Sequence, residues 1–349
     1  MIERKSEGEF RDPPRTAGLQ LECTPVESWP RFGAATGRTT FAKRDDISLI
    51  GLGGNKVRKL DLILGQAIQD GVTDVVTVGG TQSNHCRLTA AAAARLGLVS
   101  HVFLRAEGQP ARQGNVLLDH LLGAHVEFRD VQLFEELVPH VEERMNSLQL
   151  AGRNPLFVPL GGASPLGTMA YVLAVEELSK QLAASGSPVG TMVVAAGTGN
   201  TLAGITVGSA AFLPEVQVVG VSVSRTSAQL SDDVARQIEE VAPLLPFAST
   251  AQVPMIVDQF IGPGYTVPGP RTSEAVRLLA RTEGVIADLT YTGKALEFLM
   301  SDESMTRIGT APVVFWHTGG SPELFARHPE DVLATQHLEP QEPIRDRLE

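Results

Sequence analysis

The stretch Thr191-Met-Val-Val-Ala-Ala-Gly-Thr-Gly-Asn-Thr-Leu-Ala-Gly204 joins a short apolar run to a turn rich in glycine and hydroxyl groups, and then to further apolar residues. The first run has the length and the β-branched residues of a buried strand, and the glycines end it. The stretch therefore predicts a strand, a turn and a helix. This is the repeating unit of an α/β protein with parallel strands.

Other parts of the chain repeat this alternation. Tyr171, Ala174, Val175, Leu178 and Leu182 recur at the spacing of one helix face. Further strands are expected at 74–78, 101–104, 125–128, 216–221 and 313–316, and an alanine-rich helix at 89–96. The sequence thus predicts an α/β fold in which mostly parallel sheets are flanked by helices.

Length and composition narrow the classes of function. The chain has 349 residues, enough for about two domains, and a formal net charge of −11. An acidic chain without a long basic run would repel phosphate backbones, so no nucleic-acid partner is expected. Two cysteines, Cys23 and Cys86, cannot form a disulfide framework, which favours a reducing compartment.

Two further features favour a cytoplasmic protein. The start, residues 1–6, is polar and lacks the apolar core of a signal peptide. The stretch 192–212 is only weakly polar, but glycines and threonines interrupt it, so no membrane span is expected. The polar tail from Gln336 is expected to be loosely held.

The segment Gly53-Gly-Asn-Lys-Val-Arg-Lys59 is the first that can carry chemistry. A lysine becomes a nucleophile when burial or nearby cations lower its pKa, and Arg58 and Lys59 could contribute to that for Lys56. Taken alone, however, the segment is better explained as a glycine turn before a solvated basic helix.

Two strand-to-helix turns can hold anions. Gly79-Gly-Thr-Gln-Ser-Asn-His-Cys86 offers Ser83 or Asn84 as a helix cap, and the free N–H groups there suit a substrate carboxylate. The turn beginning at Gly197 could hold a phosphate in the same way. An ordinary turn explains either segment taken alone.

The turn at Gly197 also has a competing interpretation. Gly197 and Gly199 begin like a dinucleotide fingerprint, but Leu202 stands where its third glycine should be. Arg225, after the next strand, could face a 2'-phosphate. An NADP-dependent oxidoreductase therefore remains an alternative.

The late part of the chain places Tyr265, Tyr291 and His317 beside glycine-rich turns. Each of them, taken singly, is more often a structural residue than a catalytic one. The chain has no His-Glu-x-x-His or Cys-x-x-Cys motif, and its eight histidines are scattered, so no metal site is expected.

Taken in this order, the segments resemble the D-cysteine desulfhydrase and 1-aminocyclopropane-1-carboxylate (ACC) deaminase family. This family is a branch of the pyridoxal 5'-phosphate (PLP) enzymes related to the tryptophan synthase β subunit. The resemblance runs from Lys43 to His328, and the pairing of the segment 53–59 with Gln82-Ser-Asn-His85 is specific. It implies a two-domain PLP-enzyme fold with the cofactor in the interdomain cleft, and a homodimer. We expect residues 1–57 and 168–349 to form a large domain and 58–167 a small one.

The resemblance also implies roles for the matching positions. Lys56 is expected to be the Schiff-base lysine and the base for the α-proton, with Ser83, Tyr265 and Tyr291 as the other catalytic residues. Substrate contacts are expected from Gln82, Ser83, Asn84, His85 and Tyr265. Besides Lys56, the cofactor contacts are expected to be Asn84, Gly197, Thr198, Gly199, Asn200, Thr201, Tyr291, Thr292 and Thr318.

Two positions bear on the substrate. The deaminase branch has a glutamate after the second tyrosine and a leucine after the late histidine, where this chain has Thr292 and Thr318, as in the desulfhydrase branch. A hydroxyl cannot compensate a pyridinium charge, and a weaker electron sink suits loss of a good leaving group better than opening of a cyclopropane ring. The expected reaction is β-elimination from D-cysteine or a similar small amino acid, giving pyruvate, ammonia and sulfide.

Several departures from the family pattern keep other substrates open. Asp288-Leu-Thr290 replaces a usual Asp-Pro-Val, Thr266 replaces a common glycine, and Asn200 with Leu202 is closer to the deaminase style. Cysteate, other sulfur amino acids and ACC therefore remain alternative substrates. A PLP-binding protein without catalysis is the remaining alternative of another class.

Overall fold

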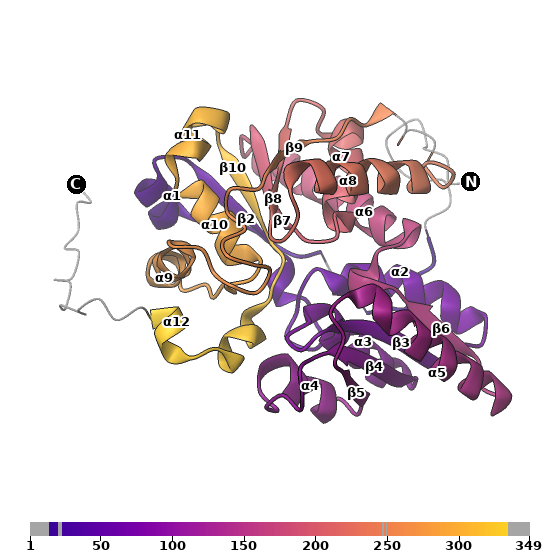
Figure 1. Cartoon of the computed structure of the whole chain (residues 1–349). Helices are drawn as coiled ribbons and strands as arrows, with labels where there is room; N and C mark the ends of the chain where they lie inside the picture. The colour runs from indigo at the N-terminus through magenta and orange to yellow at the C-terminus, as the bar shows by residue number, and fades with distance from the viewer. Residues whose placement is uncertain (1–13, 20–22, 246–247, 249, 334–349) are drawn as a thin grey trace.

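The computed structural model describes residues 14–19, 23–245, 248 and 250–333. The expectations about residues 1–6 and about the tail from Gln336 lie outside these residues. The described chain forms an α/β structure with two sheets, each flanked by helices, as the alternation of strands and helices predicts (Figure 1).

The larger sheet has six strands in the order β1-β2-β10-β7-β8-β9. Neighbouring strands of this sheet run parallel, except that β1 pairs antiparallel with β2. The strands are β1 (Val26–Ser28), β2 (Thr40–Arg44), β7 (Thr191–Ala196), β8 (Gln217–Ser222), β9 (Met255–Val257) and β10 (Val313–His317). Strands from the two ends of the described chain therefore meet in one sheet.

The smaller sheet has four parallel strands in the order β5-β4-β3-β6. They are β3 (Asp74–Gly80), β4 (Val99–Arg105), β5 (His125–Arg129) and β6 (Pro155–Val158). All four come from one continuous part of the chain, and the domain boundaries at 57/58 and 167/168 stay predictions.

Side chains that alternate along the strands build a core on each face of the larger sheet. In β7, Met192, Val194 and Ala196 pack with helices α6 (Pro165–Ser185), α7 (Asn200–Phe212) and α8 (Ser227–Val241). Val193 and Ala195 face the other way, toward a core that includes α1 (Pro30–Thr36), α9 (Thr272–Glu283) and α10 (Thr292–Leu299). Because helices cover both faces of the sheet at β7, residues on both sides of this strand are buried, and its sequence is almost continuously apolar.

The smaller sheet is covered in the same way. Helices α2 (Lys56–Gln69), α3 (Asn84–Leu96) and α4 (Gly114–Leu121) pack with cores that include Val75 and Val102, and α5 (Val138–Leu150) packs on the face of Val76 and Phe103. The remaining helical elements are α11 (Asp302–Ile308), α12 (Pro329–Leu333), η1 (Asp45–Ile47), η2 (Phe134–Leu137), η3 (Leu160–Gly162) and η5 (Ser321–Ala326).

Helix α2 connects the two halves of the molecule and lies between α6 and α3 (Figure 1). Its Leu62 packs into the core of α6 and α7, whereas Leu60 packs into the core of the smaller sheet. Helices α6 and α7 approach closely at Gly204, which has no side chain. A Cβ atom there would lie only 2.3 Å from the carbonyl oxygen of Thr168. These contacts fix the start of α2, and with it Lys56, relative to the turn after β7.

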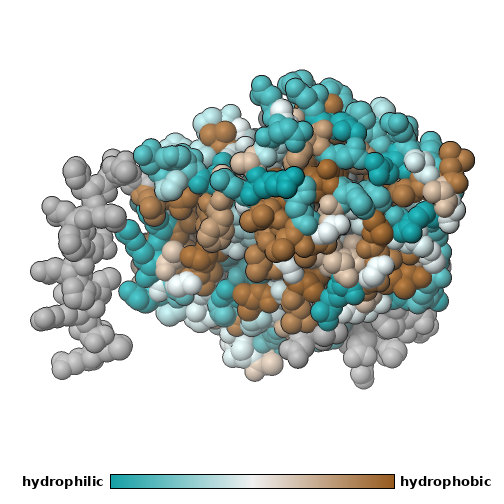
Figure 2. Space-filling model, turned by 90° about the horizontal axis from the view of Figure 1, so that it is seen from below, coloured by the Kyte–Doolittle hydropathy of each residue, from teal (hydrophilic) through white to brown (hydrophobic). Residues whose placement is uncertain are grey.

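The surface seen from below mixes hydrophilic and hydrophobic residues, with apolar residues gathered toward the middle of this face (Figure 2). In the part of the chain that the structure describes, no helix combines the length and the apolar character needed to cross a bilayer.

Candidate active site

Lys56 is the first residue of α2 and follows a tightly held turn. The N–H of Gly54 donates to the carbonyl oxygen of Asp45 at 2.9 Å, and the N–H of Asn55 donates to that of Thr318 at 3.0 Å. The side-chain amide of Asn55 also donates to Thr201 Oγ1 at 3.1 Å. The turn before Lys56 is thus bonded to η1, to the loop after β10 and to the start of α7.

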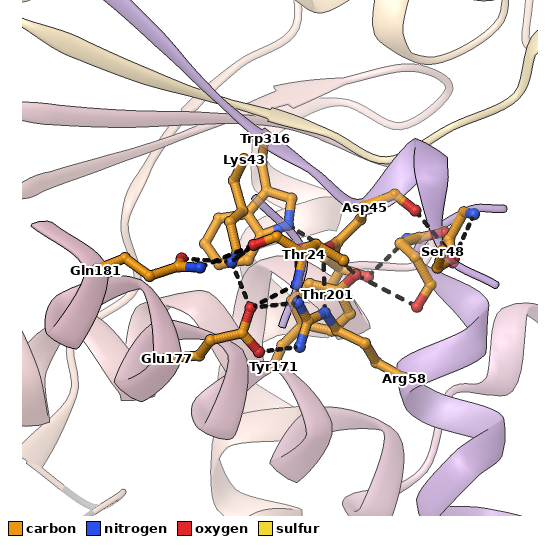
Figure 3. Close-up of polar contacts among 12 residues, drawn as sticks. Thr24, Lys43, Asp45, Ser48, Arg58, Tyr171, Glu177, Gln181, Thr201 and Trp316 are labelled. Atoms are coloured by element: carbon orange, nitrogen blue, oxygen red, sulfur yellow. Dashed lines mark hydrogen bonds and ion pairs between the residues drawn. The ribbon is translucent and has the colours of Figure 1, made fainter. Parts of the chain in front are cut away.

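A buried polar cluster around Asp45 and Arg58 lies next to this turn in the sequence and is drawn in Figure 3. The carboxylate of Asp45 accepts hydrogen bonds from Arg58 Nε at 3.0 Å, Tyr171 Oη at 2.6 Å and Trp316 Nε1 at 2.8 Å. Burial by itself raises the pKa of Asp45, but the charge of Arg58 and the hydrogen bonds from Tyr171 and Trp316 outweigh it, so the pKa lies below its ordinary value. Asp45 therefore stays ionised.

Glu177 completes the cluster by pairing with two cations (Figure 3). Its Oε2 accepts from Arg58 Nη1 at 2.8 Å, and its Oε1 pairs with Lys43 Nζ. The charge of Arg58 is thus balanced by two carboxylates, one on η1 and one on α6. We expected Arg58 to help to lower the pKa of Lys56. Instead, its guanidinium pairs with these two carboxylates and so holds α2 against η1 and α6.

The amine of Lys56 lines a cavity between the two sheets. Burial lowers the pKa of Lys56 to about 8, because the charged form loses its hydration there. Among the described residues, none forms a hydrogen bond or ion pair with its Nζ. The neighbouring Lys59 is fully buried and places its Nζ 3.4 Å from the carbonyl oxygen of Gly161. The unprotonated fraction of Lys56 near neutral pH is therefore far larger than that of an ordinary lysine.

The turn from Gly197 to Thr201 lies at the carboxyl end of β7 and starts α7. Gly199 has a φ of 83°, which a residue with a side chain rarely adopts. The first-turn N–H groups of a helix have no partners within that helix, so they offer donors to an anion. The five residues of the turn, Gly197, Thr198, Gly199, Asn200 and Thr201, all line the cavity.

The turn after β3 also lines the cavity. Ser83 caps α3, and its Oγ accepts a hydrogen bond from the N–H of Cys86 at 3.2 Å. The side-chain oxygen of Asn84 accepts from Asn115 Nδ2 at 2.9 Å. Ser83, Asn84 and His85 all line the cavity, as expected for a turn at the carboxyl end of a parallel strand.

His85 and Gln82 are placed differently from what the sequence predicts. The hydroxyl proton of Thr77 goes to the carbonyl oxygen of Val158 at 2.8 Å, so His85 Nε2, 2.8 Å from that hydroxyl, must be the donor. Burial, with the charges of Lys56 and Lys59, lowers the pKa of His85, so the ring is neutral and its Nδ1 is an acceptor. An acceptor does not hold a carboxylate.

Both the nitrogen and the oxygen of the Gln82 side-chain amide form hydrogen bonds with the backbone at the start of α4. Its Nε2 donates to the carbonyl oxygen of Gln113 at 3.2 Å, and its Oε1 accepts from the N–H of Asn115 at 2.8 Å. Gln82 lines a neighbouring cavity and not the one that contains Lys56.

Tyr265 and Tyr291 meet in the cavity although 26 positions separate them. Their phenol oxygens share a hydrogen bond, and their ring centroids lie 5.8 Å apart at an interplanar angle of 83°. Burial raises the pKa of Tyr265 to about 12, and burial together with the neighbouring Tyr265 raises the pKa of Tyr291 well above its ordinary value. Both phenols therefore keep their protons near neutral pH and can donate them.

The two threonines are in different surroundings. Thr318 lines the cavity, and its hydroxyl has no hydrogen-bond partner among the residues that the structure describes. Thr292 is fully buried away from the cavity and donates to Asp288 Oδ1 at 2.6 Å. His317 is also buried, and its ring nitrogens contact the backbone at Ile286 and Gly319. It therefore has a structural role.

The cavity measures about 310 Å³ and brings together residues that lie far apart in the sequence. It contains Lys56, Ser83, Asn84, His85, the turn 197–201, Tyr265, Tyr291 and Thr318, and it leaves out Gln82 and Thr292. Sequence analysis missed several lining residues, among them Asn55, Arg105, Phe134 and Gly161. The run Leu160-Gly-Gly162 could have indicated a turn near a ligand, but Arg105 and Phe134 carry no local signal.

The cavity fits PLP in three respects. It combines a free amine at Lys56 with helix N–H donors that suit a phosphate. The side-chain oxygen of Asn200, at the start of α7, is buried without a partner among the described residues, so it can accept a hydrogen bond from a donor group of a ligand, although not hold the phosphate itself. A Cβ atom at Gly161 would lie 3.3 Å from Thr198 Cγ2 and 3.9 Å from Lys56 Nζ, so a side chain there would fill the space between amine and turn.

Comparison with known proteins establishes the class. A family model described as "Pyridoxal-phosphate dependent enzyme" matches residues 19–319. The chain therefore belongs to this family, and its cofactor is PLP. Within the described residues, no group of three or more His, Cys, Asp or Glu residues could hold a metal ion.

Solved structures place the chain more closely. It is 34% identical to the crystal structure of an ACC deaminase homologue, which matches 89% of this chain and 93% of that one with a TM-score of 0.81. A fungal L-serine ammonia-lyase from Rhizomucor miehei is 19% identical over 86% of this chain and 94% of that one, with a TM-score of 0.65. Maize serine racemase is 18% identical, over 86% and 89%, with a TM-score of 0.61. The last two likenesses concern the fold alone.

Proposed function

We propose that the protein catalyses the PLP-dependent β-elimination of a small β-substituted amino acid, with D-cysteine as the first candidate. One observation carries the proposal. A single cavity gathers the Lys56 amine of lowered pKa, the anion-binding turn at Gly197, the Ser83 turn and the phenols of Tyr265 and Tyr291. The products from D-cysteine are pyruvate, ammonia and sulfide.

The residues divide into a cofactor side and a substrate side. The turn 197–201 would hold the phosphate and Lys56 the aldehyde carbon, with Asn84, Tyr291 and Thr318 as further contacts. The Ser83 turn would bind the substrate carboxylate through the N–H groups at the start of α3. Gln82 and His85 would support this turn through the segment at Asn115 and through Thr77, without touching the carboxylate themselves.

The chain's own groups then move protons. Bound PLP withdraws electrons from the substrate α-carbon and so makes its proton acidic. Lys56 Nζ takes that proton, because burial lowers its pKa to about 8 and so raises the fraction of the amine that is unprotonated. The Tyr265 phenol, hydrogen-bonded to Tyr291, donates a proton to the departing substituent. Released into water, the unsaturated product hydrolyses to pyruvate and ammonia.

The surroundings of Thr318 and Thr292 favour elimination over opening of a cyclopropane ring. Thr318 offers a neutral hydroxyl in the cavity, and Thr292 is engaged with Asp288. Without a carboxylate to keep the pyridine nitrogen protonated, the electron sink is weak, which suffices for a good leaving group. ACC deamination is the second candidate, and the 34% identity with an ACC deaminase homologue favours it.

A substrate panel tests the proposal. The purified holoenzyme is given each enantiomer of cysteine and of cysteate, and ACC, and pyruvate and 2-oxobutyrate are measured separately. Pyruvate from D-cysteine is the expected result. Formation of 2-oxobutyrate from ACC, with no pyruvate from cysteine or cysteate, would contradict β-elimination and support ACC deamination instead.

The homodimer and the cytoplasmic location also stay predictions. Light scattering of the purified protein tests the homodimer.

A further inference from the structure

Arg105 stands where two cavities meet. It is the last residue of β4 and pairs in register with Gly80, the last residue of β3, so it lies beside the turn that carries Ser83. Arg105 lines the cavity of Lys56 and also a second cavity of about 370 Å³. Gly80, Ser83 and Tyr265 line both cavities as well. The second cavity therefore continues the first on the substrate side.

The guanidinium of Arg105 is oriented but not neutralised. Its Cζ lies 4.2 Å from the centroid of the Phe134 ring, and its Nη1 donates to the carbonyl oxygen of Gln132 at 2.9 Å. No carboxylate in the described residues forms an ion pair with it. An arginine has five N–H donors, so most of those of Arg105 stay available for a ligand.

Other arginines nearby differ in this respect. Arg327, which lines the second cavity, pairs with Glu323, and Arg225, which lines the first, pairs with Asp233. Arg129, the register partner of Arg105 on β5, pairs with Glu127 and lines neither of the two cavities. Among the described arginines that line these cavities, Arg105 is the one whose charge no protein carboxylate balances.

The lining of both cavities is free of acids. None of the described residues that line either cavity is an aspartate or a glutamate, although the whole chain has 40 acidic residues against 29 lysines and arginines. A negative charge at Arg105 must therefore come from a ligand. The turn at Gly197 already provides donors for a phosphate, and the Ser83 turn provides donors for a carboxylate. Arg105 offers a place for a third anion.

We propose that Arg105 selects amino acids whose β-substituent carries a negative charge, such as a sulfonate. This proposal rests on the proposed β-elimination. With cysteate, the Cβ–S bond breaks and its electron pair leaves with sulfur as sulfite, while the α-proton goes to the enzyme base. The sum is cysteate and water giving pyruvate, ammonia and sulfite, with no added oxidant or reductant. A planar guanidinium suits the oxygens of such an anion.

A pair of substrates of equal shape tests the charge. Cysteate is compared with 3-(methylsulfonyl)alanine, in which a methyl group replaces one sulfonate oxygen, and both enantiomers of each are used. The kcat/KM is measured by pyruvate formation in the wild type, in Arg105→Gln, in Arg105→Lys and in the control Arg129→Gln. We expect the wild type to prefer cysteate by about tenfold or more, the range of a hydrogen bond to a charged group.

The ratio of the two kcat/KM values decides the result. It should fall toward one in Arg105→Gln, fall less in Arg105→Lys, which keeps the charge, and stay as in the wild type in Arg129→Gln. A wild-type ratio near one, or a ratio that Arg105→Gln leaves unchanged, overturns the proposal for Arg105. If that happens while the sulfone still yields pyruvate, the proposed β-elimination stands. If no substrate of this pair or of the cysteine panel yields pyruvate, the proposed function itself fails.

Discussion

The phenol of Tyr171 donates a hydrogen bond to Asp45 Oδ2 at 2.6 Å, although 126 positions separate the two residues. The same oxygen accepts from Trp316 Nε1, and the other carboxylate oxygen accepts from Arg58 Nε (Figure 3). Arg58 lies two residues after Lys56 on α2. One carboxylate thus connects the start of this helix to α6 and β10, and the position of Lys56 depends on it.

Replacing Asp45 with Asn should destabilise the protein by about 3 kcal/mol, because it leaves buried Arg58 without one of its two carboxylates. Urea unfolding of the wild type and the variant measures the change. The matched control is Asp232→Asn on the exposed surface, which should change the free energy of unfolding by no more than about 0.5 kcal/mol. Equal stability of Asp45→Asn and the control would contradict a structural role for the cluster.

Replacing Lys56 with Ala should abolish the visible absorption band of the bound cofactor and lower pyruvate formation by roughly 10³-fold or more, because the variant lacks the amine and the base. Absorption spectra and turnover are measured side by side. Lys180→Ala is the control, since the Lys180 side chain is 63% exposed and pairs with Glu176 on the surface. A band and turnover that persist in Lys56→Ala would show that another residue holds the cofactor.

The rate at which the apoenzyme takes up PLP should depend on pH through Lys56. The pKa of this lysine is lowered from 10.5 to about 8, and only the unprotonated amine reacts with an aldehyde. The rate should therefore rise with pH, reach half of its maximum near pH 8 and level off above it. Stopped-flow absorbance at a series of pH values measures it. A midpoint near 10.5 would mean that burial does not act on this amine.

Removal of the Tyr265 hydroxyl should slow the reaction without releasing the cofactor. In Tyr265→Phe we expect kcat to fall by about 10²-fold or more, because a proton donor with a pKa of about 12 is lost from the cavity. Steady-state kinetics and cofactor content provide the two measurements. A variant with full cofactor and wild-type kcat would exclude Tyr265 as a proton donor.

Replacement of the third tyrosine, Tyr171, should lower stability, because its phenol binds Asp45 and does not line the cavity. Tyr171→Phe removes a hydrogen bond to a buried carboxylate, so we expect a loss of about 1–3 kcal/mol in the free energy of unfolding. Urea unfolding measures it. An unchanged free energy of unfolding in Tyr171→Phe would contradict the importance of the Asp45 contact.

The sequence predicts most of the strands with five or more residues, but it misses β2, which also has five, and the shorter β1, β6 and β9. The runs at 74–78 and 191–195 appear as β3 and β7 within one or two residues. By contrast, β1 and β9 have three residues each, too few for a pattern, and they exist because they pair with β2 and β8. A short strand is stabilised by its neighbour in the sheet, and no local signal specifies that neighbour.

Local sequence by itself determined the segments that make the site. The turns at Gly53, Gly79 and Gly197 follow from glycines, hydroxyls and caps, whose effects act over a few residues. Only the tertiary structure decided how these segments act together. It placed Tyr265 against Tyr291, left Thr292 outside the cavity and exposed Arg105 to a cavity lining without acids. It also lowered the pKa of Lys56, because burial removes water from an amine and only the folded chain creates burial.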